Sequence, residues 1–253
     1  MANRKFLGMR RLASAVTFSL AAGGLAMPLT GMAADAPAAV TQDLYEKGGV
    51  EYWLPKAEGG DIFAQYVLGH MYCSGQKVEQ DYEKGMRWYQ AAAEAGFAPS
   101  ELAVGSLYFE GQGTQRDVAE AARWFKRAAD KGYARAQSNL AALYLSGEEG
   151  VEVDYGKALR WYREAAAQGH LVARYNLAMM YAHGLGVEQP DYVAAYGLLS
   201  SMVENGHLAA NELMQSFLGE MGEQDLAAAR DLSQTLREKD RLLVALDQRA
   251  SQR

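Results

Sequence analysis

The chain has 253 residues, of which 49% are hydrophobic and 22% are charged, and its formal net charge is −6. This length and hydrophobic content allow one or two packed domains, and 5 prolines with moderate charge argue against a wholly disordered chain. A single cysteine excludes an intramolecular disulfide and a cysteine-rich zinc cluster. The acidic balance disfavours nucleic acid as a partner, because binding to phosphates requires a basic surface.

The N-terminal segment has the organisation of an export signal. Its first 11 residues carry 4 basic and no acidic side chains, and an apolar stretch over 12–29 follows. Small residues precede Ala34, so we predict a cleaved signal peptide over 1–33 and a linker over 34–42. The alternative is a retained anchor helix, but the stretch is short and rich in Gly, Ser and Thr for a span of about 20 apolar residues. Cleavage would leave a periplasmic or secreted protein with no stable membrane span, and Met9 is an alternative start.

An internal repeat of 36 or 37 residues occupies most of the remaining chain. Tyrosines recur at this spacing, and each is followed three residues later by a glycine: Tyr72, Tyr108, Tyr144 and Tyr181, then Gly75, Gly111, Gly147 and Gly184. Tryptophans have the same period at Trp88, Trp124 and Trp161, with Leu198 in the fourth place. We therefore predict four full repeats, over 61–96, 97–132, 133–169 and 170–206, flanked by capping half-repeats.

Each repeat has the pattern of two helices joined by a loop. In the first repeat, apolar residues recur with the spacing of one helix face: Ala64, Val67, Leu68, Met71 and Tyr72. Gly75 follows this helix, and Asp81 stands where its carboxylate can cap the second helix. Equivalent aspartates recur at Asp117, Asp154 and Asp191. A helix pair of this kind cannot bury its apolar face alone, so we expect the repeats to stack.

The segments Ala136–Tyr144, AQSNLAALY, and Asp154–Gly169, DYGKALRWYREAAAQG, resemble Sel1-like repeats, which are relatives of tetratricopeptide repeats. The resemblance covers residues 43–236. It implies an all-α fold, a right-handed α-solenoid of helix-turn-helix repeats, in an exported bacterial member of the family. Three positions depart from the pattern, at Lys77, Thr114 and Leu198. Residues 237–253 are expected to form either a C-terminal helix or a flexible tail.

No group of residues predicts catalysis, a cofactor or a metal site. Cys73 is a single thiol near the end of a helix with no positioned base, so a structural role is favoured over that of a nucleophile. His170 and His207 occupy equivalent places after the glycines that end two repeats, which favours packing or surface roles over a shared metal site. We therefore expect a protein that is not an enzyme and has no catalytic, cofactor-binding or metal-binding residues.

If the geometry follows the tetratricopeptide relatives, the first helices of the repeats line a concave surface. The candidate partner-binding side chains on this surface are Tyr66, His70, Leu102, Ser106, Phe109, Ser138, Leu145, Tyr175, Met179 and His183. This mixture of aromatic, aliphatic and small polar residues suits an apolar peptide or helix, because aromatic anchors dominate the energies of interfaces. The alternative is that half of these side chains are buried between the repeats.

The resemblance favours a periplasmic adaptor or regulator that binds a protein or peptide partner in the cell envelope. Two alternatives remain. One is a secreted hydrolase of the β-lactamase-like Sel1 type, but those proteins carry a cysteine pair in each repeat and this chain has only Cys73. The other is an envelope scaffold that self-associates through an open end of the repeat array.

Overall fold

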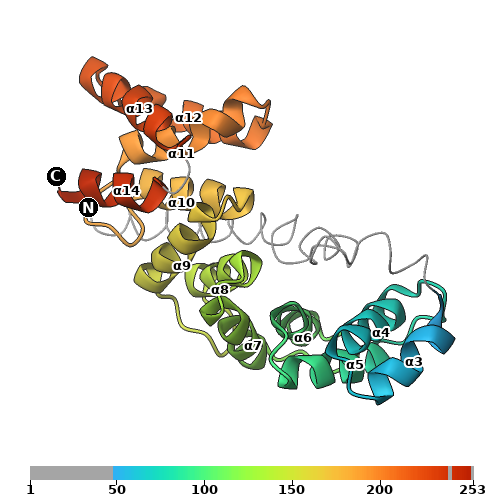
Figure 1. Cartoon of the computed structure of the whole chain (residues 1–253). Helices are drawn as coiled ribbons and strands as arrows, with labels where there is room; N and C mark the ends of the chain where they lie inside the picture. The colour runs from blue at the N-terminus through green and yellow to red at the C-terminus, as the bar shows by residue number, and fades with distance from the viewer. Residues whose placement is uncertain (1–47, 239–240, 252–253) are drawn as a thin grey trace. The chain divides into compact units, whose positions relative to one another are not determined.

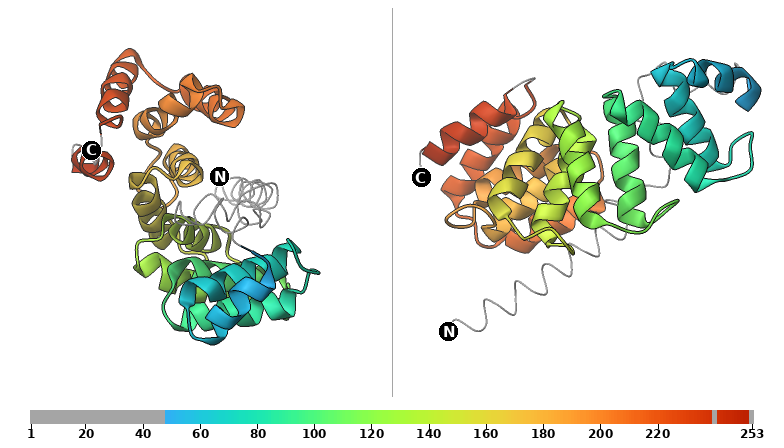
Figure 2. Two further views of the ribbon diagram at one scale, coloured as in Figure 1. Left: turned by 45° about the vertical axis from the view of Figure 1, so that its right-hand side comes forward. Right: turned by 90° about the horizontal axis from the view of Figure 1, so that it is seen from below.

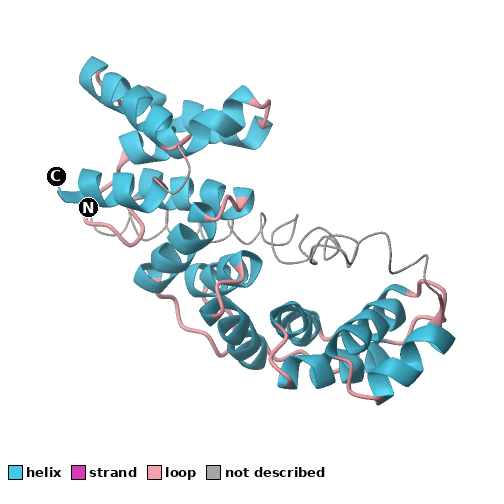
Figure 3. Cartoon of the chain, in the orientation of Figure 1, coloured by secondary structure: helices cyan, strands magenta, loops and turns pink. Residues whose placement is uncertain are grey.

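The computed structural model describes residues 48–238 and 241–251, and every regular element within these ranges is a helix (Figures 1 and 3). These ranges contain no strand, which confirms the predicted all-α fold. The predicted signal peptide over 1–33 and the linker over 34–42 lie outside the described residues.

The chain divides into two compact units between Glu152 and Val153, and each unit is described by itself. Unit 1 contains α3 (Val50–Glu58), α4 (Ile62–Ser74), α5 (Tyr82–Glu94), α6 (Ala98–Glu110), α7 (Val118–Asp130) and α8 (Ala134–Ser146). Unit 2 contains α9 (Tyr155–Ala167), α10 (Leu171–His183), α11 (Tyr192–Glu204), α12 (Leu208–Leu218), α13 (Glu223–Thr235) and α14 (Leu242–Ser251). Consecutive helices from α3 to α8 pack side by side in unit 1, as do α9, α10 and α11 in unit 2 (Figure 2).

The ends of the helices are fixed by the residues that the sequence pattern predicts. The first helix of each repeat ends at a glycine with a left-handed backbone, and the φ angles of Gly75 and its three equivalents lie between 67° and 70°. The second helix begins at the predicted aspartate. The Asp81 carboxylate accepts a hydrogen bond of 2.9 Å from the backbone N–H of Lys84, and Asp117, Asp154 and Asp191 cap their helices in the same way.

Small residues on the first helices allow a large ring from the second helix to pack against their backbone. A Cβ atom added to Gly69 would lie 2.6 Å from the Tyr89 ring, and one added to Gly105 would lie 2.6 Å from the Phe125 ring. Both rings are fully buried, so this contact forms the centre of each helix pair. A larger side chain at either glycine would force the two helices apart.

A polar side chain in the first turn of the first helix ties a repeat to the helix that precedes it. In the first repeat, Gln65 Nε2 donates a hydrogen bond of 3.2 Å to the carbonyl oxygen of Ala57, and the third repeat repeats this bond. The second repeat has a buried carboxylate, Glu101, which cannot donate when ionised. Arg127 provides the equivalent hydrogen bond instead, because it donates to the Ala93 carbonyl oxygen at 3.0 Å. It also pairs with Glu101 at 3.1 Å.

Unit 2 ends in a different arrangement, because α12 and α13 both pack against α11. A Cβ atom added to Gly197 on α11 would lie 3.1 Å from Leu232 Cγ and 3.4 Å from Leu236 Cδ1. The first three repeats have an arginine and a tryptophan at the positions of Gly197 and Leu198. The smaller pair leaves room for α13, which gives the departure at Leu198 a structural reason.

Helix α14 folds back onto the fourth repeat. The Arg249 guanidinium donates from Nε to both carboxylate oxygens of Asp191, at 2.8 and 2.9 Å, and Asp191 is only 5% exposed. Asp247 on the same helix pairs with Arg163 of α9. Three apolar side chains of α14 are buried against the unit: Leu242, Ala245 and Leu246.

Candidate binding surfaces

The ten candidate partner-binding side chains are divided between the two units. In unit 1 they lie on α4, α6 and α8, and in unit 2 they lie on α10. Six of them are buried: Tyr66, His70, Leu102, Ser138, Leu145 and Met179. The other four reach the surface at least in part, namely Ser106, Phe109, Tyr175 and His183. A partner could contact only these four directly without moving a helix.

Tyr66 belongs to an aromatic cluster inside unit 1. It is 1% exposed, and its ring centroid lies 5.6 Å from that of Tyr89 and 5.3 Å from that of Phe97. Phe97 comes from the loop that opens the next repeat, and it meets Tyr66 edge to face. Tyr66 therefore packs between two repeats and contributes to stability.

The last turn of α6 presents the accessible part of the unit 1 candidates. Phe109 is half-buried, and the Arg116 guanidinium lies 5.4 Å from the centre of its ring. Arg116 also pairs with Glu148 at 3.2 Å, which holds the guanidinium in place. Burial raises the pKa of the adjacent Glu110 carboxyl, and among the described residues Glu110 makes no ion pair. A partly exposed aromatic ring and an unpaired carboxylate in the same helical turn are suitable contacts for an apolar segment that carries a basic group.

The accessible candidates of unit 2 lie on α10. Tyr175 is half-buried, and burial raises the pKa of its hydroxyl, with a smaller contribution from the charge of Glu212 on α12. His183 is exposed in the last turn of the helix. The loop residue that would face Tyr175, by analogy with Phe97 beside Tyr66, is the exposed His207. The ring of Tyr175 therefore keeps a free side.

Cys73 lies in the core of unit 1. Burial, with a smaller contribution from Asp81, raises the pKa of its thiol to about 12. A Cβ atom added to Gly85 would lie 2.2 Å from the Cys73 Sγ atom, so the thiol fills the space beside this glycine. A buried, protonated thiol is a poor nucleophile and a poor metal ligand. Within 48–238 and 241–251, no three His, Cys, Asp or Glu side chains gather as a metal site would require.

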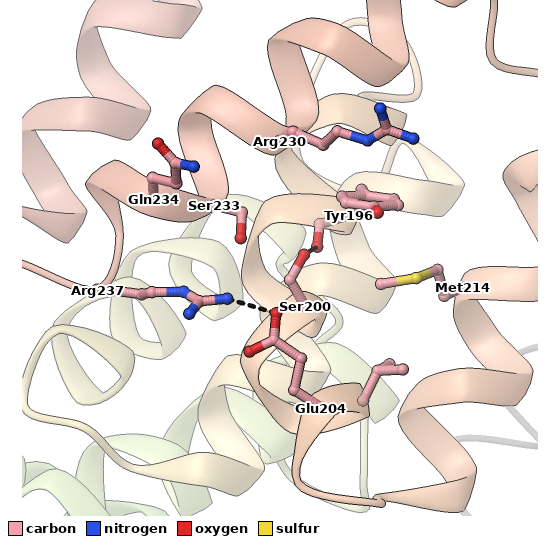
Figure 4. Close-up of a pocket in the computed structure, with 9 residues that line it drawn as sticks. Tyr196, Ser200, Glu204, Met214, Arg230, Ser233, Gln234 and Arg237 are labelled. Atoms are coloured by element: carbon pink, nitrogen blue, oxygen red, sulfur yellow. Dashed lines mark hydrogen bonds and ion pairs between the residues drawn. The ribbon is translucent and has the colours of Figure 1, made fainter.

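Unit 2 also contains a pocket between α11, α12 and α13, which the sequence pattern did not predict (Figure 4). Its volume is about 290 Å³, and α13 contributes the side chains Arg230, Ser233 and Gln234 to its wall, while Arg237 comes from the turn that follows this helix. The three positions on α13 have the i, i+3, i+4 spacing of one helix face. The signal in the sequence that could have indicated this pocket is the polar stripe on α13.

The helix pairs, the glycine and aspartate helix ends and the ring-on-glycine contacts define a class of helical repeat protein. A family model described as Sel1 repeat matches residues 62–97, 98–133, 134–170 and 171–207. These segments make up more than half of the chain, so the chain belongs to the Sel1 repeat family. Repeats of this family typically mediate interactions between proteins and are generally not catalytic.

Several solved structures resemble the chain, and two of them serve for comparison. One is c5321 of uropathogenic Escherichia coli, described as a protective antigen with an SLR fold, which shares 32% sequence identity with a TM-score of 0.68. The match covers 81% of this chain but 43% of the E. coli chain, so the chain spans less than half the length of that relative. The other is a Sel1 repeat protein from Oxalobacter formigenes, at 25% identity and a TM-score of 0.65, with 77% of this chain and 82% of that chain covered. A search of curated proteins found no match. None of the helices in the described part of the chain combines the length and apolar character needed to cross a membrane.

Proposed function

We propose that the chain is an exported, non-enzymatic adaptor that binds a protein or peptide partner in the cell envelope through the first helices of its repeats. The observation that carries the proposal is the presence of a half-buried aromatic side chain on a first helix in each unit, Phe109 on α6 and Tyr175 on α10. Aromatic residues of this kind lose little conformational entropy on binding and bury a large area, so they are the usual anchors of an interface.

The surroundings of Phe109 indicate the chemistry of the partner. The Arg116 guanidinium lies over the ring of Phe109, and Glu110, the following residue of the chain, has a raised pKa and no ion pair among the described residues. A partner that brings an apolar side chain together with a lysine or arginine would satisfy both groups. A basic residue near the contact also fits the net charge of −6 of this chain, since opposite charges favour association.

The test is capture of partners from an envelope extract by wild-type protein and by matched variants. Phe109→Ala with Tyr175→Ala should lose a captured protein that wild type retains, while helix content by circular dichroism stays unchanged. The control is Arg87→Gln with Arg123→Gln, two exposed arginines on second helices, which should retain the same protein. Equal capture by the aromatic variant and the control would show that these first-helix aromatics do not bind the partner.

Export is a separate part of the proposal, supported by the basic and then apolar N-terminal segment. The E. coli relative is described as a protective antigen. We propose that this chain leaves the cytoplasm. N-terminal sequencing of protein recovered from the envelope or the medium should begin at Ala34. Recovery of the full-length chain from the cytoplasm alone would contradict export.

The hydrolase alternative is disfavoured by the state of the single cysteine, because Cys73 is buried and the pKa of its thiol is raised to about 12. Purified protein should not hydrolyse a chromogenic β-lactam. Self-association can be separated from the adaptor role by light scattering, which should give the mass of one chain at all protein concentrations.

A further inference from the structure

The pocket between α11, α12 and α13 lies on different helices from the candidate first-helix surface of unit 2, which belongs to α10. It forms because the α12–α13 connection turns both helices onto α11, and their side chains leave a space of about 290 Å³. This volume is close to the lower limit of small-ligand pockets, roughly 300 Å³. The pocket can therefore hold a small molecule or the end of a chain, but not a folded element.

One wall of the pocket is rich in hydrogen-bond donors. The polar side chains of α13 line the pocket, where Ser233 is buried while Arg230 and Gln234 also reach solvent. Ser233 is 8% exposed, and its hydroxyl makes no hydrogen bond with any described residue. Ser200 on the opposite wall, by contrast, donates to the Tyr196 carbonyl oxygen at 2.7 Å, as helical serines commonly do. The Ser233 hydroxyl is thus available to a ligand.

The charges that line the pocket do not cancel. Arg237 and Glu204 pair with each other at one end (Figure 4). Arg230 lies at the Tyr196 end, and it forms no ion pair with any residue that the structure describes. The lining therefore carries one uncompensated positive charge. A guanidinium presents a planar pair of N–H donors that matches the two oxygens of a carboxylate.

The opposite wall has an apolar part beside Ser200 and Glu204. Met214 from α12 is buried and points into the pocket, and the ring of Tyr196 lies on the α11 side (Figure 4). Val203 of α11 also lines the pocket. A ligand that fills the space must therefore combine an anionic group for Arg230 with a small apolar group for Met214 and Val203. We propose that this pocket binds a carboxylate attached to a small apolar group, supplied either by the C-terminal residue of a peptide or by a small organic acid. The peptide source rests on the proposed adaptor function, and the organic-acid source does not.

Calorimetric titration of the whole protein with three probes tests the ligand. The probes are N-acetyl-Ala-Leu with a free carboxylate, the same dipeptide as its C-terminal amide, and 4-methylpentanoate, which has the leucine side-chain skeleton without the peptide. The free dipeptide should bind at least tenfold more tightly than the amide. Tighter binding of the dipeptide than of 4-methylpentanoate supports the peptide source, and equal binding supports the organic acid. Equal affinities of dipeptide and amide, or no binding by any probe at millimolar concentration, would overturn the proposal.

Variants locate the binding. Arg230→Gln should weaken carboxylate binding at least tenfold, and Ser233→Ala should weaken it less, whereas Arg87→Gln in unit 1 should bind as wild type does. Arg230 and Arg87 are both exposed, so neither change should alter the melting temperature. Wild-type affinity in Arg230→Gln would overturn the assignment of the site. The probes contain no protein partner, so a failure of the titration would not contradict the capture result with Phe109→Ala and Tyr175→Ala. A failure of the capture experiment would likewise not contradict binding of a carboxylate in the pocket.

Discussion

Unit 1 and unit 2 place the same repeat position in different surroundings. Tyr66 and Tyr175 occupy equivalent places on α4 and α10, yet Tyr66 is 1% exposed and Tyr175 is half-buried. The next repeat provides Phe97 beside Tyr66, whereas the residue at the equivalent position after Tyr175 is the exposed His207. The repeat pattern thus sets the helix face on which a residue lies, and the following repeat decides how much of it water reaches.

On the second helices, a change of residue type accompanies a change of packing partner. Arg160 and Trp161 on α9 have the pattern of the earlier repeats, and the guanidinium lies 5.0 Å from the centre of the tryptophan ring. On α11 the equivalent residues are Gly197 and Leu198, and α13 packs there instead. A departure from the repeat consensus thus marks the place where the array gains a different neighbour.

The largest expected effect separates the two tyrosines. Tyr66→Ala should lower the free energy of unfolding of unit 1 by about 3–5 kcal/mol, because it empties the centre of an aromatic cluster. Tyr175→Ala should cost about 1 kcal/mol or less, as usual for a side chain with one side in water. Urea denaturation followed by circular dichroism gives both values. Similar losses in the two variants would mean that the environments do not differ as described.

The second test restores the consensus arginine in the fourth repeat. Gly197→Arg should destabilise unit 2 by about 1–3 kcal/mol, since the new side chain must displace Leu232 and Leu236. The matched control is Gly156→Arg on α9, an exposed glycine of the same unit, which should be neutral or stabilising because arginine favours a helix over glycine. A stable Gly197→Arg protein would show that α13 does not depend on this close approach.

The third test concerns the capping aspartates. Arg249→Met should lower the stability of unit 2 by about 1–3 kcal/mol, because it removes a charged partner from the buried Asp191 carboxylate. Lys84→Met removes the partner of the more exposed Asp81 and should have a smaller effect, since water screens that pair. Thermal unfolding of both variants provides the comparison. A larger loss in Lys84→Met would contradict the assigned burial.

The smallest expected effect is on the labelling rate of Cys73. Because the chain has 1 cysteine and it lies in unit 1, labelling measures the opening of unit 1 alone. At pH 8, iodoacetamide should label Cys73 only when unit 1 opens, so Tyr66→Ala should accelerate labelling and Gly197→Arg should not. Acceleration by both variants would show that the units unfold together.

The pH dependence of this thiol has a defined sign. Burial raises the pKa of Cys73 from 9.0 to about 12, so the folded state holds the proton more tightly than the unfolded state does. The stability that the thiol contributes is complete below pH 9 and is lost as the pH rises toward 12. Cys73→Ala should therefore lose less stability than wild type over this range, as measured by urea denaturation at each pH. A steeper loss of stability in Cys73→Ala than in wild type would contradict a raised pKa of Cys73 in the folded state.

The sequence predicted those features that depend on local chemistry. Gly75 and Asp81 end and begin helices because a left-handed turn and a capping carboxylate each require particular residue types. The exposure of Tyr66 could not be predicted in the same way, since it depends on Phe97, which is 31 residues further along the chain and in another repeat. The pocket was missed because α12 and α13 lie outside the four matched repeats, and their packing on α11 follows no repeat rule.

The ion pair between Arg249 and Asp191 has a consequence for the order in which the protein is made. The two residues are separated by 58 positions, so the start of α11 stays incomplete until residue 249 has been synthesised. Unit 1 ends at Glu152 and is compact by itself, so we expect it to fold while the rest of the chain is still emerging. Released chains that end just before and just after Arg249 should therefore differ in the protease resistance of α11, but not in that of α4.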